Sequence, residues 1–161
     1  GCEVTSPLAT LASVKLSNQP VIITVLRAGL VYFQGFMNYF DKADSGFIGA
    51  YRKEGGDEVK INLDYLATPD LTGREVILVD PMLATGKSFI QSINALLKHG
   101  HPSHLHIAAL IASPEGVRYV QGNMKIPYTL WTFAVDTKLN DRFYIVPGLG
   151  DAGDLSFGEK L

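Results

Sequence analysis

A chain of 161 residues has the size of one ordinary domain, so we expect residues 1–161 to form a single domain around one core. Hydrophobic residues make up 47% of the chain and charged residues only 19%, which favours a well-buried sheet and argues against a disordered chain. The net charge of −2 argues against a general nucleic-acid binder, because such proteins carry a clustered basic excess.

The first predicted elements are a short helix and a buried strand. Residues 7–18 predict a helix that offers Leu8, Leu11 and Leu16 for packing. Residues 21–26 form a continuous apolar run, which is typical of a strand buried on both faces. A helical segment over residues 30–40 follows.

The turn after this strand, Arg27-Ala28-Gly29, is a candidate ligand site. Gly29 allows a positive φ or the close approach of a ligand. The Arg27 guanidinium has five donors in a fixed fork that suits a pyrophosphate. A surface arginine in an ordinary strand-to-helix turn is an equally good reading of these residues alone.

A hairpin is predicted next. Residues 47–53 form a strand that becomes charged, and residues 54–57 form a loop. Apolar and polar residues alternate over residues 59–65, which is typical of a half-exposed antiparallel strand. We expect a mobile hairpin.

The most informative stretch covers residues 75–99. A buried strand over residues 75–79 ends in Asp80, and apolar residues recur with a period of 3.6 over residues 89–99, which predicts a helix. Between them, residues 84–88 are small or carry hydroxyls. Backbone N–H groups and the helix N-terminus of such a turn form an anion site, and phosphate is the favoured guest.

Two alternatives compete for this stretch. Gly86-Lys87-Ser88 suggests the P-loop of a nucleotide kinase, but that motif requires glycine where this chain has Pro81. Proline offers no N–H and fixes φ, which weakens the P-loop reading. An ordinary strand-to-helix turn is the other alternative.

The remaining elements complete an α/β pattern. A buried strand is predicted over residues 105–112, a helix with Ser113 at its N-cap and Pro114 at its first position, and strands over residues 129–135 and 143–146. We therefore expect a mostly parallel, twisted sheet flanked by helices. Sites in such sheets lie at the carboxyl ends of the strands, where Arg27, Asp80 and the turn after Val146 fall.

The four histidines lie within eight residues and could suggest a metal cluster; they are His99, His101, His104 and His106. Gly100 and Pro102 mark a helix end and a turn, and no cysteine joins them. We therefore expect a solvated loop rather than a metal site.

The closing motif is residues 144–154, which hold three glycines in six residues after a strand. The main chain of such a loop can come within hydrogen-bonding distance of a flat ligand. A neutral base suits such a site. Uracil, for example, presents an acceptor, a donor and an acceptor along one edge, which backbone groups match without charge. Cytosine, by contrast, would leave a buried mismatch, which discriminates strongly.

Taken together, these motifs resemble the uracil phosphoribosyltransferases of the type I phosphoribosyltransferase superfamily. The resemblance rests on residues 26–30, 49–52, 80–86 and 144–154, in the family's order. It implies a type I fold with a β-hairpin arm. The N-terminal segment of the family is expected to be missing here.

The resemblance also implies roles for individual residues. Arg27, Asp80 and Asp151 are the expected catalytic residues. The uracil site is expected at Ile145, Gly150, Asp151 and Ala152. The donor, 5-phospho-α-D-ribose 1-diphosphate (PRPP), is expected at Arg27, Arg52, Asp80, Pro81, Met82, Leu83, Ala84, Thr85, Gly86, Lys87, Ser88 and Asp151.

The implied activity is transfer of the phosphoribosyl group from PRPP to uracil, which gives UMP and diphosphate in pyrimidine salvage. Mg²⁺ is expected to be held mainly by diphosphate and water, with no direct protein ligand. The alternative is a catalytically silent uracil or UMP sensor, because Lys53, Lys87 and Leu155 depart from the family pattern.

The expected partners are the two small substrates and further copies of the chain, in a homodimer or larger homo-oligomer. The hairpin over residues 59–65 is a plausible contact. No apolar run reaches the roughly 18 residues that a membrane span needs, and the lone Cys2 excludes an internal disulfide. We expect a cytoplasmic protein with no membrane or nucleic-acid partner.

Overall fold

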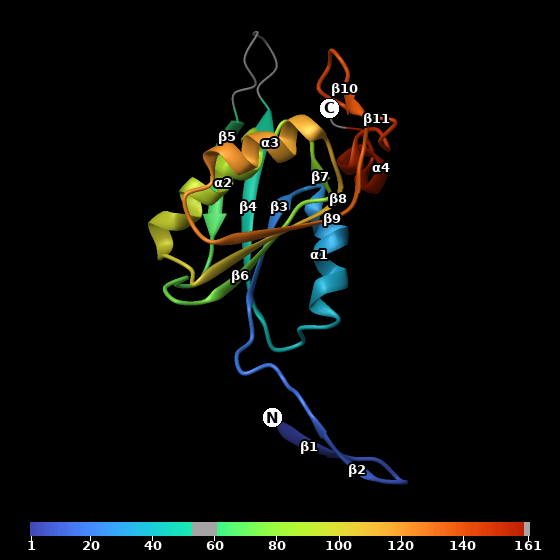
Figure 1. The fold of residues 1–161 in the computed structure, drawn as a ribbon. Helices are drawn as coiled ribbons and strands as arrows, with labels where there is room; N and C mark the ends of the chain where they lie inside the picture. Colours follow the sequence, from blue (N-terminus) through green and yellow to red (C-terminus); the bar gives the residue numbers. More distant parts are fainter. Residues whose placement is uncertain (53–60, 160–161) are drawn as a thin grey trace.

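The centre of the protein is one mixed sheet (Figure 1). The computed structural model describes residues 1–52 and 61–159, and the side chains of all of these except 50–52 and 61–64. The sheet has the order β5–β4–β3–β6–β8–β7, with β9 also paired to β8. Its strands are β3 (Val21–Leu26), β4 (Asp44–Arg52), β5 (Ile61–Ala67), β6 (Glu75–Val79), β7 (Met82–Leu83), β8 (His104–Ala112) and β9 (Tyr128–Val135).

All pairs in this sheet are parallel except β4 with β5. The predicted mostly parallel sheet is therefore confirmed, and so is the antiparallel partner of β4. Residues 53–60 lie outside the described part of the chain. The predicted loop over 54–57 and the unusual Lys53 fall there.

The central strands are buried on both faces, as their apolar runs predict. Val21, Ile22 and Ile23 of β3 have no exposed surface. Ile23 packs into a core on one face of the sheet and Ile22 into a core on the other. Both faces therefore need a layer of helices.

The helices supply those two layers. Helix α1 (Gly29–Met37) covers one face through Phe33. Helices α2 (Lys87–Leu96) and α3 (Pro114–Asn123) cover the other, and a short 3₁₀ turn (Leu97–His99) extends α2. Figure 1 shows α2 and α3 together, away from α1. The helices predicted from residues 30, 89 and 114 are all confirmed.

The helix predicted over residues 7–18 is wrong. This region forms an antiparallel hairpin of β1 (Cys2–Thr5) and β2 (Thr10–Ser13), which projects from the body in Figure 1. The Ser6 hydroxyl accepts hydrogen bonds from the N–H groups of Leu8 (3.2 Å) and Ala9 (3.1 Å). These local bonds stabilise a turn with proline at its second position, where a helix would have to begin.

The strand predicted over residues 143–146 is only partly correct. Just β11 (Ile145–Val146) is extended, and it pairs antiparallel with β10 (Lys138–Leu139) outside the main sheet. Phe143 has a φ of 61°, which no strand residue adopts. A short helix, α4 (Ala152–Phe157), then ends the described chain, where the sequence predicted only a loop.

The solvated loop predicted for the histidines is also partly wrong. His104 and His106 lie in β8, where the His104 ring bonds the Thr129 hydroxyl (2.9 Å) and His106 Nδ1 accepts from the Trp131 indole (3.1 Å). Strand β8 begins one residue before the predicted start, at His104, which pairs with Glu75 of β6. In the part of the chain that the structure describes, no helix is both long and apolar enough to cross a bilayer.

Candidate functional site

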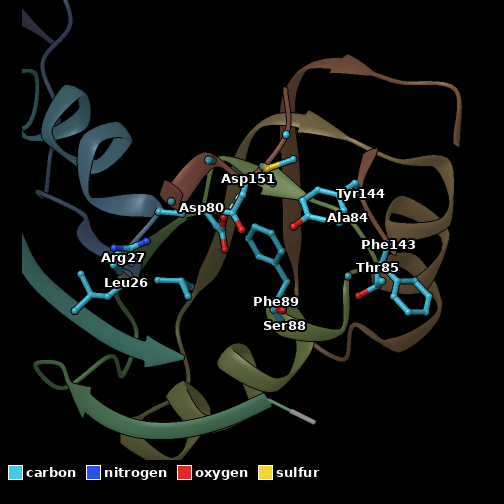
Figure 2. A pocket seen from close by; sticks show the side chains of 17 residues that line it. Leu26, Arg27, Asp80, Ala84, Thr85, Ser88, Phe89, Phe143, Tyr144 and Asp151 are labelled. Carbon is cyan, nitrogen blue, oxygen red and sulfur yellow. Dashed lines mark hydrogen bonds between the residues drawn. The ribbon is translucent and has the colours of Figure 1, made fainter. Parts of the chain in front are cut away.

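Three segments far apart in the sequence line one cavity of about 360 Å³ (Figure 2). The first is the end of β3 with Arg27 and Ala28. The second follows β6 and includes Asp80 and the turn over residues 84–88, which we call the phosphate turn. The third is residues 143–158, which we call the C-terminal segment. The cavity brings Arg27, Asp80 and Asp151 together at the carboxyl ends of the strands.

The phosphate turn depends on Gly86, which adopts a φ of 76°. A Cβ at Gly86 would lie 2.8 Å from the carbonyl oxygen of Gly116 in α3, so a side chain is excluded by space as well as by conformation. Lys87 N–H donates to the Thr85 hydroxyl (3.4 Å) as α2 begins. Gly86 and Ser88 line the cavity on either side of Lys87, so the N-terminus of α2 lies at the cavity, as an anion site requires.

Residues at the start of helix α3 hold the phosphate turn in place. The Ser113 hydroxyl donates to the carbonyl oxygen of Ala84 (2.6 Å) and accepts from Gly116 N–H (2.9 Å). A Cβ at Gly116 would overlap the Ala84 carbonyl. The sequence predicts Ser113 as a helix cap but misses both its bond to the turn and the packing role of Gly116. A glycine in the first turn of a helix was the one available signal.

Asp80 follows β6 directly and is half-buried at the cavity wall. Its Oδ1 accepts from Met82 N–H (3.2 Å), and its own N–H donates to the Ala108 carbonyl (3.1 Å). The carbonyl of Pro81 accepts the N–H groups of Leu110 (2.9 Å) and Ile111. The strand is therefore interrupted at Pro81. Asp80 lies at this break, and the chain then continues as β7.

The predicted donor-site residues do not all reach the cavity. Those that line it are Arg27, Asp80, Met82, Ala84, Thr85, Gly86, Ser88 and Asp151. Pro81 and Leu83 are buried in the sheet region, and Lys87 is exposed. The side chain of Arg52 lies outside the described residues, so its role stays a prediction.

Arg27 is anchored by the C-terminal segment. Its Nη2 donates to Asp154 Oδ1 (2.8 Å) and to the carbonyl of Gly158 (2.9 Å), and its guanidinium lies 5.9 Å from the centre of the Phe157 ring. Its Nε is buried and has no hydrogen-bond partner among the described residues. The sequence did not predict these contacts, because they join residues 127 or more positions apart.

The C-terminal segment presents backbone to the cavity. Asp151 caps α4 by accepting from Asp154 N–H (3.0 Å), and Gly150 adopts a φ of 84°. Gly150, Asp151 and Ala152 line the cavity, as the predicted uracil site requires. Ile145 is buried and does not line the cavity, and its carbonyl lies against Gly148.

Two aromatic residues also line the cavity. Phe143 and Tyr144 precede β11, and both are partly exposed. The sequence placed both in a strand, so it missed their contribution to the site. The only signal was that two aromatic residues stand at the start of the glycine-rich motif.

The oxygen atoms that line the cavity bear on whether it can bind a metal ion. Among the described residues, no three His, Cys, Asp or Glu side chains gather where they could hold one ion. Asp80 and Asp151 nevertheless line the cavity and offer the hard oxygen donors that Mg²⁺ prefers. These residues fit an ion that takes most of its ligands from a substrate phosphate and water.

The sequence has close relatives of known family. It matches the uracil phosphoribosyltransferase family over residues 1–159. It is 46% identical to the uracil phosphoribosyltransferase of Porphyromonas gingivalis and 38% identical to that of Methanothermobacter thermautotrophicus, each over 159 residues. These alignments cover 98% and 97% of this chain and 74% and 72% of the relatives.

Solved structures agree on the fold. The AQ2163 protein of Aquifex aeolicus superposes with a TM-score of 0.84 at 32% identity, over 99% of this chain and 76% of that one. A purine phosphoribosyltransferase of Pyrococcus horikoshii superposes with a TM-score of 0.51 at 21% identity, over 76% of this chain and 82% of that one, and supports the fold alone. With the cavity built from the three predicted motifs, these matches show that the chain belongs to the uracil phosphoribosyltransferase family.

Proposed function

We propose that the protein transfers the phosphoribosyl group of PRPP to uracil, forming UMP and diphosphate. One observation carries the proposal: in a member of this family, Arg27, Asp80, four of the five residues of the phosphate turn and Gly150–Ala152 line a single cavity of about 360 Å³. A cation, an acid, an anion-binding turn and a neutral glycine-lined wall are the parts that a diphosphate, a ribose, a phosphate and a pyrimidine require.

The reaction needs no nucleophile from the protein. As the C1′–oxygen bond to diphosphate breaks, positive charge develops on the ribose ring; N1 of uracil then forms the new bond to C1′ and loses its proton to solvent. Catalysis should therefore come from positioning and electrostatic stabilisation. Arg27 is proposed to neutralise the leaving diphosphate, and its anchors Asp154 and Gly158 hold the guanidinium before substrate arrives.

Asp80 and Asp151 are assigned to other groups of the two substrates. We assign Asp80 to the ribose hydroxyls, because it stands between Arg27 and the phosphate turn in Figure 2. Asp151 is assigned to the place where base and ribose meet, and the backbone of Gly150 and Ala152 to the uracil edge. Ile145 is assigned there only through its backbone, and Arg52 to the donor phosphates.

A bound Mg²⁺ would add charge neutralisation of the diphosphate, with Asp80 and Asp151 as the nearest candidate ligands from the chain. Assembly into a homodimer or larger oligomer stays part of the proposal. No observation favours the sensor alternative. Pro81, whose carbonyl is built into the sheet, occupies the position at which a P-loop needs glycine.

One assay tests the proposal. The protein is incubated with labelled uracil, PRPP and Mg²⁺, and UMP is separated and counted; the expected result is UMP that requires all three. Cytosine in place of uracil is expected to give at least about 10⁴-fold less product. Binding of uracil or UMP without turnover would support the sensor instead, and nucleoside-triphosphate hydrolysis without UMP would support a kinase.

A further inference from the structure

Phe143 has an unusual backbone conformation. Its φ of 61° makes it the one non-glycine residue with a positive φ in the part of the chain that the structure describes. For a bulky residue this left-handed conformation is a true outlier. Such residues persist only where their surroundings fix them, and they cluster at functional sites.

Asn140 fixes Phe143 in this conformation. The Asn140 side-chain oxygen accepts from the N–H groups of Arg142 (3.0 Å) and Tyr144 (2.9 Å). Its backbone carbonyl accepts from Phe143 N–H (2.9 Å), and its own N–H donates to the Tyr144 carbonyl (2.9 Å). Four hydrogen bonds within five residues therefore hold a turn that would suit glycine or asparagine better than phenylalanine.

The strained residue lies at the cavity. Phe143 lines it, although the residue is 41% exposed and so is only partly packed against the protein. In Figure 2 the Phe143 ring lies at the end of the pocket occupied by Thr85 of the phosphate turn, and Arg27 lies at the other end. The ring thus faces one subsite of the cavity rather than the whole of it.

We propose that Phe143 is a specificity-determining residue, whose ring forms an apolar wall beside the phosphate turn and shields a bound 5′-phosphate from water. This inference rests on the proposed function, because it assumes that the phosphate turn holds a sugar phosphate. Excluding water strengthens the hydrogen bonds that backbone N–H groups make to an anion. The ring also gains buried surface only when the ligand is present.

The test compares ligands that fill different ends of the cavity. Isothermal titration calorimetry with Mg²⁺ measures the Kd of ribose 5-phosphate, of PRPP and of inorganic diphosphate for the wild type, Phe143→Asn and Phe143→Tyr. Asparagine suits the left-handed conformation but removes the ring, whereas tyrosine keeps the ring. Phe133→Asn, at an exposed residue of β9 that does not line this cavity, is the matched control.

We expect Phe143→Asn to weaken ribose 5-phosphate and PRPP about tenfold and to change diphosphate less than about twofold, because diphosphate binds at the Arg27 end. Phe143→Tyr and the control should bind like the wild type. The thermal midpoint of Phe143→Asn should not fall, because relief of backbone strain offsets the lost packing of a partly exposed ring. A purely structural phenylalanine would not show this combination.

The inference is overturned if Phe143→Asn binds ribose 5-phosphate like the wild type, or if diphosphate weakens equally. A fall in thermal midpoint of more than about 4 °C would also overturn it, since the ring would then be a packing residue. If the wild type binds none of the three ligands, the proposed function fails together with the inference. If it binds all three and the asparagine variant does too, the inference alone fails.

Discussion

The phosphate turn and the C-terminal segment line the same cavity but are held in different ways. The turn lies between a central strand and a long helix. Its Ala84 carbonyl accepts a hydrogen bond from Ser113 at the start of α3, and Gly116 of α3 packs against the same carbonyl. The C-terminal segment lies outside the main sheet, on a two-stranded ribbon and the short helix α4. It is linked to Arg27 through Asp154 and Gly158, and to Asp136, just after β9, through the N–H of Gly148.

This difference separates two tasks. The turn is rigid because the backbone geometry of a parallel sheet dictates where the strand ends and the helix begins. The C-terminal segment is held mainly by polar contacts, which also place Arg27. Substitutions in the turn should therefore damage folding and activity together, whereas substitutions in the segment should change substrate binding with little effect on stability.

The largest expected effect comes from two charged residues of the shared cavity, Arg27 and Asp80. Arg27→Ala and Asp80→Asn should each lower kcat/KM for PRPP by about 10²- to 10³-fold, because each removes a charge placed for the transition state. The thermal midpoint should change little. Steady-state kinetics and thermal unfolding measure both quantities.

Arg74→Ala is the matched control for Arg27. Arg74 also forms an ion pair, with Asp44 (2.9 Å), but it lies away from the cavity. Arg74→Ala should leave kcat/KM within about twofold of the wild-type value, because Arg74 does not line the cavity and a surface ion pair contributes little to stability. Unchanged kinetics in Arg27→Ala or Asp80→Asn would reject the role assigned to that residue.

The second effect tests the rigidity of the phosphate turn. Gly116→Ala should destabilise the protein by about 1–3 kcal/mol and lower activity, because its Cβ would overlap the Ala84 carbonyl and displace the turn. Gly122→Ala, in the same helix, meets no atom within 4 Å and should stabilise by about 0.5–1 kcal/mol. Urea unfolding distinguishes them, and equal stabilities would contradict the account of the turn.

The third effect tests the C-terminal segment. Asp154→Ala should raise the KM for PRPP about fivefold to tenfold and leave the KM for uracil within about twofold, because it frees the Arg27 guanidinium. The pair is partly exposed, so the loss of stability should stay below about 1 kcal/mol.

A double variant shows whether Asp154 acts through Arg27. In an Arg27→Ala background, Asp154→Ala should cause no further loss of kcat/KM. Additive losses would mean that Asp154 has a separate role. A fall of several kcal/mol in stability would mean that the segment is as rigid as the turn, which would break the comparison.

The smallest effect, on the thermal midpoint, is expected at Asp70, which lies outside both regions. Hydrogen bonds from the Thr72 backbone N–H and then from its hydroxyl hold the pKa of Asp70 below its ordinary value of 3.8. The resulting stabilisation is complete above about pH 4 and is lost as the pH falls through the lowered pKa. The thermal midpoint of the wild type should exceed that of Asp70→Asn by no more than about 2 °C at pH 7. A gap that does not shrink in acid would contradict this.

Sequence reasoning reached the sheet and the phosphate turn because their signals are local. Apolar runs end at Arg27 and Asp80, and caps such as Ser113 mark where helices begin. It failed for the N-terminal hairpin, where the hydrogen bonds of Ser6 decide a turn, and for Phe143, whose conformation is imposed by Asn140. Neither outcome is visible in hydrophobic periodicity.

For the site, sequence reasoning found the residues that present a charge or a glycine to the cavity, and it missed those that hold them. Asp154, Gly158 and Gly116 act through contacts between segments distant in the chain. Pro81, Leu83 and Lys87, which are also predicted at the donor site, do not line the cavity. Which residues of a turn point into a cavity depends on the path of its backbone, and the sequence does not give that path.

The most direct measurement is a crystal structure of the protein with UMP. We predict the 5′-phosphate on the N–H groups of the phosphate turn, the ribose hydroxyls at Asp80 and the uracil edge on the backbone of Gly150–Ala152. A phosphate at Arg27 with the base against the phosphate turn, or UMP bound outside this cavity, would contradict the assignment of the two regions.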